Sequence, residues 1–448
     1  MQRLEAEHDG LLAVLQRAVA AGDGEVAVHL AARLTWFWFL TGRQVAGGRW
    51  LTETLTAPGG SPALRATCRV FAAMGTMETG DWTAALPELR AVTALPAEET
   101  WASGEPLGAL AWGISAVFTG GFRDVGVLDR LRDHPDPWVV AAVRGVRVQV
   151  AENTGESQDL ADEIAEVHAE FTRLGDRWGQ TFTASALAES HATDGDLEAA
   201  IAGYTKAVRL SEELGTNDDT PMMRIRLAQA RAAAGDLATA AAEVDRVLAD
   251  VRRDGGFQLA FAEAAAGGLA LLEGRVAEAE RWHRQAITWT AGMVGGPPQM
   301  TAVLHVGLGV ALALRAPETG DPDPLLAESE AELDRGLHLA ARVAADMPAA
   351  AQAVAARAAL ALARGDAAGA ATVLGWATAV RGRRDRGDLM VRELDRRVQD
   401  ALGPAEAERR HAAGAAVPRA DVLAGLGIDS TGSWPGVAEE AAAQTRRR

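Results

Sequence analysis

The sequence of 448 residues contains a single cysteine, a single lysine and a single tyrosine. One cysteine, Cys68, cannot form a disulfide within the chain, and such sparse use of cysteine favours a reducing compartment. We interpret Cys68 as a small buried apolar side chain. Because Lys206 is the only lysine, arginine supplies 43 of the 44 lysine and arginine residues. The abundance of arginine is therefore not by itself a sign of phosphate recognition.

The sequence also lacks an excess of positive charge and a long apolar run. Its net charge of −17 opposes attraction to nucleic acid phosphates, so we expect no direct nucleic acid binding. The N-terminal stretch "MQRLEAEHDG" is polar and does not resemble a signal peptide. The most apolar window, 301–314, is shorter than the roughly 20 residues that a spanning helix needs. We therefore predict a cytoplasmic protein without a membrane segment.

Motifs for catalysis, metal binding and nucleotide binding are missing as well. The nine histidines are scattered, without an HExxH pattern or a paired Cys/His set. Ser190 and His191 are adjacent but belong to no GxSxG motif. Thr205 precedes Lys206 where a P-loop needs glycine. The sequence thus predicts no catalytic residues, no metal site, no cofactor and no enzymatic activity.

What the sequence has in quantity is alanine and other apolar residues, which make up 48% of the chain. With few β-branched runs, this composition favours helices that approach one another closely. The segments "ATDGDLEAAIAGYTKAV" and "AAAGDLATAAAEVDRVL" place Gly195 and Gly235 at equivalent positions, 40 residues apart. Similar turns occur at Gly80-Asp81, Gly274-Arg275 and Gly365-Asp366, and weaker ones at Gly42, Gly120 and Gly155.

Residues at fixed distances from these turn glycines agree among the five clear units. The positions five residues after and seven residues before each turn are all small: Ala85, Ala200, Ala240, Ala279, Ala370, and Ala73, Ala188, Ala228, Gly267, Ala358. We expect each glycine to end a helix in a left-handed conformation, after which a second helix folds back antiparallel. Small facing residues let the two backbones approach, and stacking of pairs buries the apolar faces.

This arrangement resembles the tetratricopeptide repeat (TPR), although the period near 40 exceeds the usual 34 or so. The fold class we predict is all-α, a right-handed superhelix of antiparallel helix pairs forming a TPR-like α-solenoid. The predicted organisation is a linking helix at 1–24, an array of about eight pairs over 25–381, capping helices over 382–428 and a disordered tail over 429–448. The arginine cluster at 381–386 is interpreted as solvated surface.

The concave face of such an array is the candidate binding surface, because the first helix of each pair lines the inner groove. Positions six and ten residues before the turn glycines should point there. A few polar groups in an apolar groove suit a small molecule or a peptide. The alternative, that each is simply a solvated polar position, stays open. The groove residues predicted in this way are Gln149, Ser185, Glu189 and Gln229, with Ile114 and Met74 as apolar members.

Four consecutive aromatic residues stand in the stretch "TWFWFLTG" at 35–42, although the chain has only 12 Trp, 9 Phe and 1 Tyr. The run is too short for a membrane anchor, and successive helical residues point about 100° apart. We expect Leu30, Leu34 and Trp38 to face the first helix. Trp36 and Phe39 should contact the helix that carries Trp50 and Leu51. An aromatic cage for a ligand is the alternative.

The two ends of the chain resemble a known family. Residues 3–55, with "LEAEHD" at 4–9, the aromatic run and "RWL" at 49–51, are similar to the start of the C-terminal helical-repeat region of actinobacterial SARP/AfsR-type transcriptional regulators. Residues 374–414 are similar to the end of that region. A related region occurs in large LuxR-type ATPase regulators. The N-terminal DNA-binding, activation and ATPase domains expected in such regulators have no counterpart in this sequence.

The resemblance implies a regulatory or sensor domain. It would bind a protein partner or a small-molecule or peptide effector in its groove, and control ATPase and DNA-binding domains that are separate from this sequence. A stand-alone adaptor that mediates protein–protein interaction is the alternative. The residue pattern leaves both hypotheses open.

Overall fold

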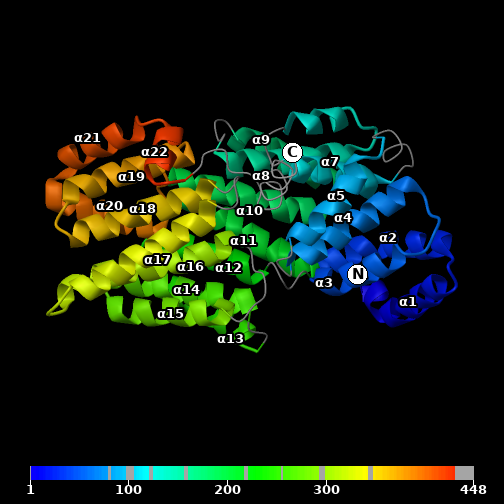
Figure 1. Cartoon of the computed structure of the whole chain (residues 1–448), viewed down its shortest axis with the longest axis horizontal. Helices are drawn as coiled ribbons and strands as arrows, with labels where there is room; N and C mark the ends of the chain where they lie inside the picture. The colour runs from blue at the N-terminus through cyan, green and yellow to red at the C-terminus, as the bar shows by residue number, and fades with distance from the viewer. Residues whose placement is uncertain are drawn as a thin grey trace, which may run out of the picture.

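The computed structural model describes residues 2–78, 82–96, 105–120, 125–155, 160–215, 220–253, 256–291, 298–341 and 347–428. Every regular element within these ranges is a helix, and successive helices pack antiparallel in pairs (Figure 1). The prediction of an all-α superhelix of helix pairs is therefore confirmed. The predicted turn at Gly80-Asp81 and the predicted tail at 429–448 lie outside the described residues.

The chain opens with α1 (Gln2–Ala20), which packs against the first pair. The first helices of the pairs are α2 (Gly24–Leu40), α4 (Pro62–Glu78), α7 (Pro106–Thr119), α8 (Pro137–Thr154), α10 (Arg177–Asp194), α12 (Thr220–Ala233), α14 (Gly256–Leu272), α16 (Pro298–Arg315) and α18 (Met347–Ala363).

The second helices are α3 (Gln44–Thr54), α5 (Trp82–Thr93), α9 (Leu160–Leu174), α11 (Leu197–Leu214), α13 (Leu237–Val251), α15 (Val276–Ala291), α17 (Asp323–Ala341) and α19 (Ala367–Arg381), with the 3-10 segment η1 (Val125–Leu131) after α7. A second 3-10 segment, η2 (Ala316–Glu318), follows α16. The chain continues with α20 (Leu389–Leu402), α21 (Pro404–Ala415) and α22 (Arg419–Gly425).

The Gly-Asp turns work as paired helix stop and start signals. Gly195, Gly235 and Gly365 have φ values of 86°, 94° and 80°, which only glycine adopts without strain. The aspartate after each glycine then caps the next helix; for example, Asp196 Oδ1 accepts a hydrogen bond from the Ala199 amide at 3.1 Å. Gly120 departs from the prediction, because its φ of −79° is right-handed and η1 replaces a full second helix.

The predicted small residues lie where paired helices meet. Ala188, Ala200, Ala240 and Ala370 are completely buried. A Cβ at Gly203 of α11 would lie 2.8 Å from the Ala188 Cβ of α10, so a larger residue would separate this pair. This part of the prediction is confirmed. Cys68 is also buried, and burial raises the pKa of its thiol to about 12.

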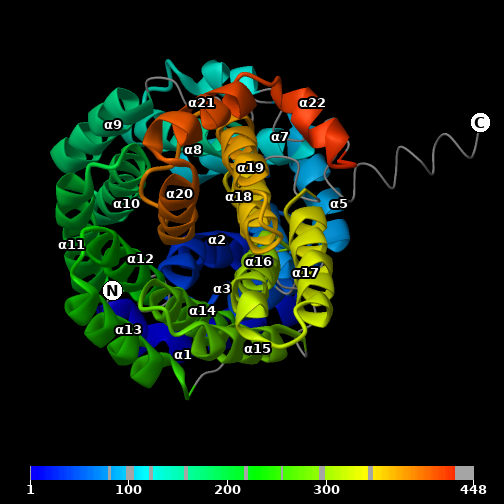
Figure 2. The same ribbon diagram turned by 90° about the vertical axis from the view of Figure 1, so that its left-hand side faces the viewer.

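The middle and C-terminal pairs close into a ring. Figure 2 looks along this ring, with α8, α10, α12, α14, α16 and α18 on the inside and α9, α11, α13, α15 and α17 outside them. The last of the inner helices, α18, returns to contact α8. The array thus completes a turn on itself, and its concave face becomes the lumen of the ring.

The lumen is partly filled by the chain itself. Helix α20 lies inside the ring and contacts α12, α14 and α18, while α21 and α22 cover α19 (Figure 2). Leu394 and Val398 of α20 are almost completely buried. Helix α20 forms where the sequence predicts one, but it packs within the superhelix instead of lengthening the stack.

Helix α16 belongs to the most apolar part of the chain. The stretch Met300–Glu318 is long and apolar enough to cross a membrane by length and composition, and 67% of it is buried inside the fold. Helices α14, α15, α17 and α18 surround it, and its His305 contacts the carboxylate of Glu332. Its apolar surface is thus accounted for by the neighbouring helices.

Candidate functional site

The connection between α19 and α20, residues 382–388, crosses the lumen and is called the strap. It lies directly on α10: the Arg386 amide donates to the Thr193 carbonyl at 2.8 Å. Gly387 comes so close that a Cβ there would lie 2.2 Å from the Ala192 carbonyl oxygen. Glycine at 387 is therefore needed for the strap to reach the helix backbone.

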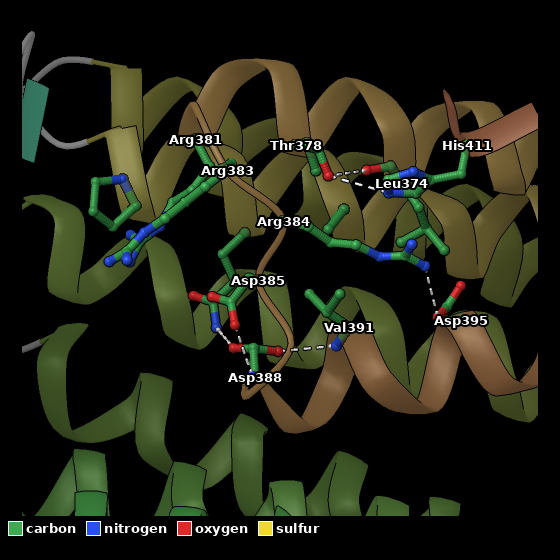
Figure 3. Close-up of a pocket in the computed structure, with 15 residues that line it drawn as sticks. Leu374, Thr378, Arg381, Arg383, Arg384, Asp385, Asp388, Val391, Asp395 and His411 are labelled. Carbon is green, nitrogen blue, oxygen red and sulfur yellow. Dashed lines mark hydrogen bonds and ion pairs between the residues drawn. The ribbon is translucent and has the colours of Figure 1, made fainter. Parts of the chain in front are cut away.

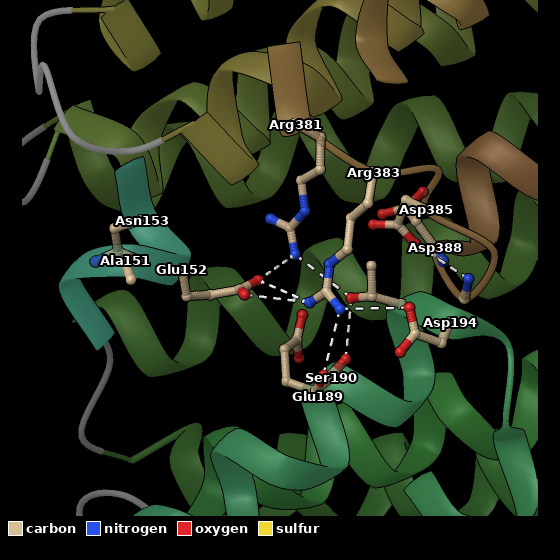
Figure 4. A network of polar contacts seen from close by, with 12 residues as sticks. Ala151, Glu152, Asn153, Glu189, Ser190, Asp194, Arg381, Arg383, Asp385 and Asp388 are labelled. Carbon is tan, nitrogen blue, oxygen red and sulfur yellow. Dashed lines mark hydrogen bonds and ion pairs between the residues drawn. The ribbon is translucent and has the colours of Figure 1, made fainter. Parts of the chain in front are cut away.

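Two arginines join the strap region to the opposite wall of the ring (Figure 4). Arg381 Nη2 donates to Glu152 Oε1 of α8 at 2.8 Å, and Arg383 Nη2 lies 3.1 Å from the other carboxylate oxygen. Arg383 Nη1 also contacts Asp194 Oδ1 at 3.3 Å. The side chains of Arg381 and Glu152 are only 7% and 17% exposed. The interpretation of 381–386 as solvated surface is wrong for Arg381 and Arg383, because the ring closes around them.

A second polar cluster lies beside these arginine contacts, on α10, α11 and α12. The two clusters together are called the polar layer. The Tyr204 hydroxyl donates to Glu189, and Arg226 Nη1 lies 3.6 Å from Glu189 Oε2. Burial alone would raise the pKa of Glu189, but the Arg226 guanidinium and the Tyr204 hydroxyl outweigh it and hold this pKa below its ordinary value. Burial and the neighbouring Glu189 carboxylate raise the pKa of Tyr204 well above its usual value. Glu189 is therefore an anion paired from two sides.

The polar layer separates two cavities, of which the larger is called the outer cavity. It has a volume of about 480 Å3 and lies between α2, α8, α10 and α12. Its wall carries hydrogen-bonding groups from Gln149, Ser185 and Glu189 beside the aromatic rings of Trp178 and Phe182. Its size falls within the usual range for small-molecule sites.

The aromatic wall belongs to a cluster that includes half of the "WFWF" run. The Trp36 ring lies 5.0 Å from Trp178 and 5.7 Å from Trp138, and Phe39 lies 5.9 Å from Phe71. Trp36 and Phe39 thus contact aromatic rings of α4, α8 and α10, while their expected contact with the helix of Trp50 stays a prediction. Phe71 is buried, and the other rings of the cluster are half-buried.

Trp38 behaves differently from its neighbours. Its indole N–H donates to His8 Nε2 of α1 at 2.9 Å, as expected for a side chain that faces the first helix. A Cβ at Gly47 of α3 would lie 2.8 Å from the Trp38 ring, so this ring fills the junction of α1, α2 and α3. The aromatic run is therefore divided between a structural contact and the wall of the lumen.

The second cavity, called the inner cavity, has a volume of about 190 Å3 and lies between α10, α12, α14, α16 and the strap. Glu189 and Gln229 line it, as do Asp385 and Asp388 at the strap. Most of the remaining wall is apolar: Met222, Ile225, Phe261, Leu271, Val303, Val306, Val310, Leu389 and Met390. His283, which is 4% exposed, also lines it.

The other side of the strap is tightly joined to the C-terminal helices (Figure 3). Arg384 Nη2 lies 3.1 Å from Asp395 Oδ2, and Asp388 Oδ1 accepts from the Val391 amide at the start of α20. Thr378 Oγ1 lies 3.1 Å from His411 Nε2. The cavity at this place measures only about 30 Å3, so it offers space for a water molecule and not for an organic ligand.

The structure therefore places the predicted groove residues as follows. Gln149 and Ser185 line the outer cavity, Gln229 lines the inner cavity, and Glu189 lines both. Met74 and Ile114 lie apart from both cavities and pack against the N-terminal core. The sequence singles out the arginines at 381–386 but does not indicate their partner, because Arg381 and Glu152 are 229 positions apart.

Ser190 and His191 do not form a nucleophile–base pair. The Ser190 hydroxyl contacts Arg383 of the strap at 3.3 Å, whereas His191 Nδ1 lies 3.9 Å from Asp196 at the turn. Within the described ranges, no group of three or more His, Cys, Asp or Glu residues is arranged to hold a metal ion.

Replacing Gly387 by alanine should loosen the strap. The added Cβ meets the Ala192 carbonyl, which belongs to a helix backbone and cannot turn aside. We expect trypsin to cleave after Arg383, Arg384 or Arg386 at least tenfold faster than in the wild type, measured by mass spectrometry during limited digestion. Gly425→Ala is the matched control, because a Cβ there meets nothing within 4 Å. Equal cleavage rates would show that the strap is not held by this contact.

Asp385 should give the fold a distinctive pH dependence. Burial and the nearby Asp388 carboxylate raise its pKa from 3.8 to about 6, against the opposing effect of Arg381. Because the folded state then binds the proton more tightly, this group's contribution to stability falls as pH rises from about 4 to about 6. Asp385→Asn should therefore be more stable than the wild type at pH 7, by about 1–2 kcal/mol after allowance for solvent screening. Urea unfolding at pH 7 and pH 4 should show this advantage vanish on acidification.

Comparisons of the chain with known proteins find similar solved structures. No protein-family model matches it, and no curated protein matches it either. Among solved structures, it is similar to "Crystal structure of APC/C hetero-tetramer Cut9-Hcn1", with 16% identity, a TM-score of 0.42, and coverage of 89% of this chain and 75% of that one. It is also similar to "Circular tandem repeat protein with novel repeat topology and enhanced subunit contact surfaces", with 16% identity, a TM-score of 0.17, and coverage of 98% and 99%. These values carry no argument about function.

Proposed function

We propose that this chain is a regulatory helical-repeat module that binds a peptide segment or a small effector in its lumen. The observation that carries the proposal is the outer cavity, which presents half-buried aromatic rings and hydrogen-bonding side chains on one concave wall. Aromatic side chains with a few placed polar groups are typical of ligand sites. The absence of a catalytic motif in the sequence favours binding over chemistry.

The proposed mechanism is a shift between closed and open rings. The strap and the Arg381–Glu152 pair hold the two walls of the ring together, and the same walls line the outer cavity. A ligand that contacts both walls would favour the closed state, whereas one that inserts between them would favour the open state. Either change would alter the surface that the module presents to another domain.

The resemblance to SARP/AfsR-type regulators supports a specific setting for this mechanism. In that setting the module would restrain or release ATPase and DNA-binding domains within the cytoplasm. The alternative is a stand-alone adaptor for another protein. The reading frame upstream of Met1 separates the two, because an adjoining ATPase domain supports the regulator and an independent start supports the adaptor.

Lumen binding can be tested without knowing the natural ligand. A displayed random-peptide library would be panned against the wild type and then titrated against Ser185→Trp, which fills the outer cavity, and against Ala202→Trp, which enlarges an exposed residue of α11. We expect enriched peptides to lose at least tenfold in affinity for the first variant only. Equal affinity for all three proteins would place binding outside the lumen.

A further inference from the structure

The inner cavity contains more negative than positive charge on its own wall. Among the described residues that line it, Glu189, Asp385 and Asp388 contribute three carboxylates, and Arg226 is the one guanidinium. Arg381 and Arg383 are not on this wall, and both are engaged with Glu152. Carboxylates that line a largely apolar cavity are costly unless a cation pairs with them.

The strap carboxylates are oriented by hydrogen bonds from the backbone and from Gln352. Asp385 Oδ1 accepts from the Gly387 and Asp388 amides at 3.0 and 2.9 Å. Asp388 accepts from Gln352 Nε2 at 2.9 Å and from the Val391 amide. Both side chains are thus fixed at the edge of the cavity, while burial and mutual repulsion raise the pKa of Asp385.

An independent feature of the same cavity is the imidazole of His283. Both of its ring nitrogens are buried and have no hydrogen-bond partner among the described residues. Burial lowers the pKa of His283 to about 4, so the ring is neutral at physiological pH. An unpaired buried polar group costs free energy that a ligand group or water can recover.

We infer that the inner cavity is a binding site for a small organic ammonium ligand with an apolar body. The ammonium group would pair with the carboxylates of Asp385, Asp388 and Glu189, and the apolar body would lie against Val306, Val310 and the other apolar lining residues. The neutral His283 ring forms part of the same wall, with its nitrogens packed against Gly267 and Gly307. This inference rests on the proposed role of the lumen and names a ligand class for one part of it.

The same geometry connects such a ligand to the strap. Asp385, Gly387, Asp388, Leu389 and Met390 all line the inner cavity, and the strap is also the segment that crosses the ring. A bound ammonium ion would neutralise repulsion between the two strap carboxylates and hold the strap against α10. Occupancy should therefore slow tryptic cleavage after Arg383, Arg384 and Arg386.

Three probes with one apolar body and different charge test the inference: hexylamine, hexan-1-ol and hexanoate. Their affinities for the full chain would be measured by calorimetry up to about 10 mM. We expect hexylamine to bind at least tenfold more tightly than hexan-1-ol, and hexanoate not to bind. Tighter binding of hexanoate, or no binding of any probe while lumen peptides still bind, would overturn the inference and leave the proposed function intact.

Variants locate the site and separate the two proposals. Gly268 lines the inner cavity and a Cβ there meets nothing within 4 Å, so Gly268→Leu should obstruct the cavity and remove hexylamine binding. Asp385→Asn with Asp388→Asn keeps the helix cap and should reduce the preference for hexylamine over hexan-1-ol below about threefold. Ser185→Trp should weaken peptide binding at least tenfold and leave hexylamine binding unchanged. Unchanged hexylamine affinity in folded Gly268→Leu would contradict the assignment.

Discussion

Replacing Glu152 by glutamine should lower the free energy of unfolding by about 3 kcal/mol and open the ring. The substitution leaves the guanidinium groups of Arg381 and Arg383 facing a neutral amide, although their side chains are only 7% and 17% exposed. Arg383 keeps its contact with the Asp194 carboxylate, so the loss falls mainly on Arg381. Breaking one side of a largely buried ion pair costs more than the pair contributes, because the remaining charge is desolvated without compensation. Urea unfolding would measure the loss, and X-ray scattering would detect the larger radius of gyration.

The matched control is Glu166→Gln on α9, the partner helix of α8 in the same pair. Glu166 also bonds an arginine of α8, Arg144, at 2.7 Å, but its side chain is 69% exposed. We expect a change within about 0.5 kcal/mol, as is usual for exposed pairs. If both variants lost the same small amount, the Arg381–Glu152 contact would not be what closes the ring.

Replacing Gly307 by alanine should destabilise the fold by about 2–3 kcal/mol, although alanine favours a helix by about 1 kcal/mol. A Cβ at 307 would lie 2.3 Å from His283 Cε1 and 2.6 Å from Nδ1. The ring is also packed against Gly267, where a Cβ would lie 2.8 Å from Nε2, and this second contact restricts its movement. Calorimetric melting would report the loss as a lower Tm.

Gly10→Ala is the control for this substitution, since Gly10 lies within α1 and a Cβ there meets nothing within 4 Å. It should be neutral or slightly stabilising. Combining Gly307→Ala with His283→Ala should restore part of the stability, because the second change removes the colliding ring. Destabilisation of similar size by Gly10→Ala would show that the loss of stability does not come from the collision with the His283 ring.

The packing around His283 and the ion pair of Glu152 differ in how far the sequence predicts them. Gly267 is among the small residues expected from the repeat pattern, and the ring of His283 explains why the position is small. Nothing in the sequence distinguishes Glu152 from the many other acidic residues on helix surfaces. Its role is visible only in the tertiary structure, where α18 contacts α8 and the Arg381 side chain bonds to Glu152.

The candidate site also contains some residues that the sequence predicts, and the same rule fails for others. The rule of positions six and ten before a turn glycine was sufficient to choose Gln149, Ser185 and Glu189, which line one cavity. That rule is local, since it depends only on the helical period and on the antiparallel pairing of adjacent helices. It failed for Met74 and Ile114, which pack in the N-terminal core away from the lumen.

The sequence by itself determined the helical class, the Gly-Asp turns and the small residues between paired helices, because each depends on neighbours within about 40 positions. The closure of the ring, the strap across the lumen and the two cavities were decided only by the tertiary structure. Each pair adds a small rotation to the next, and these rotations accumulate along the array. Whether distant walls meet depends on their sum, which no single repeat encodes.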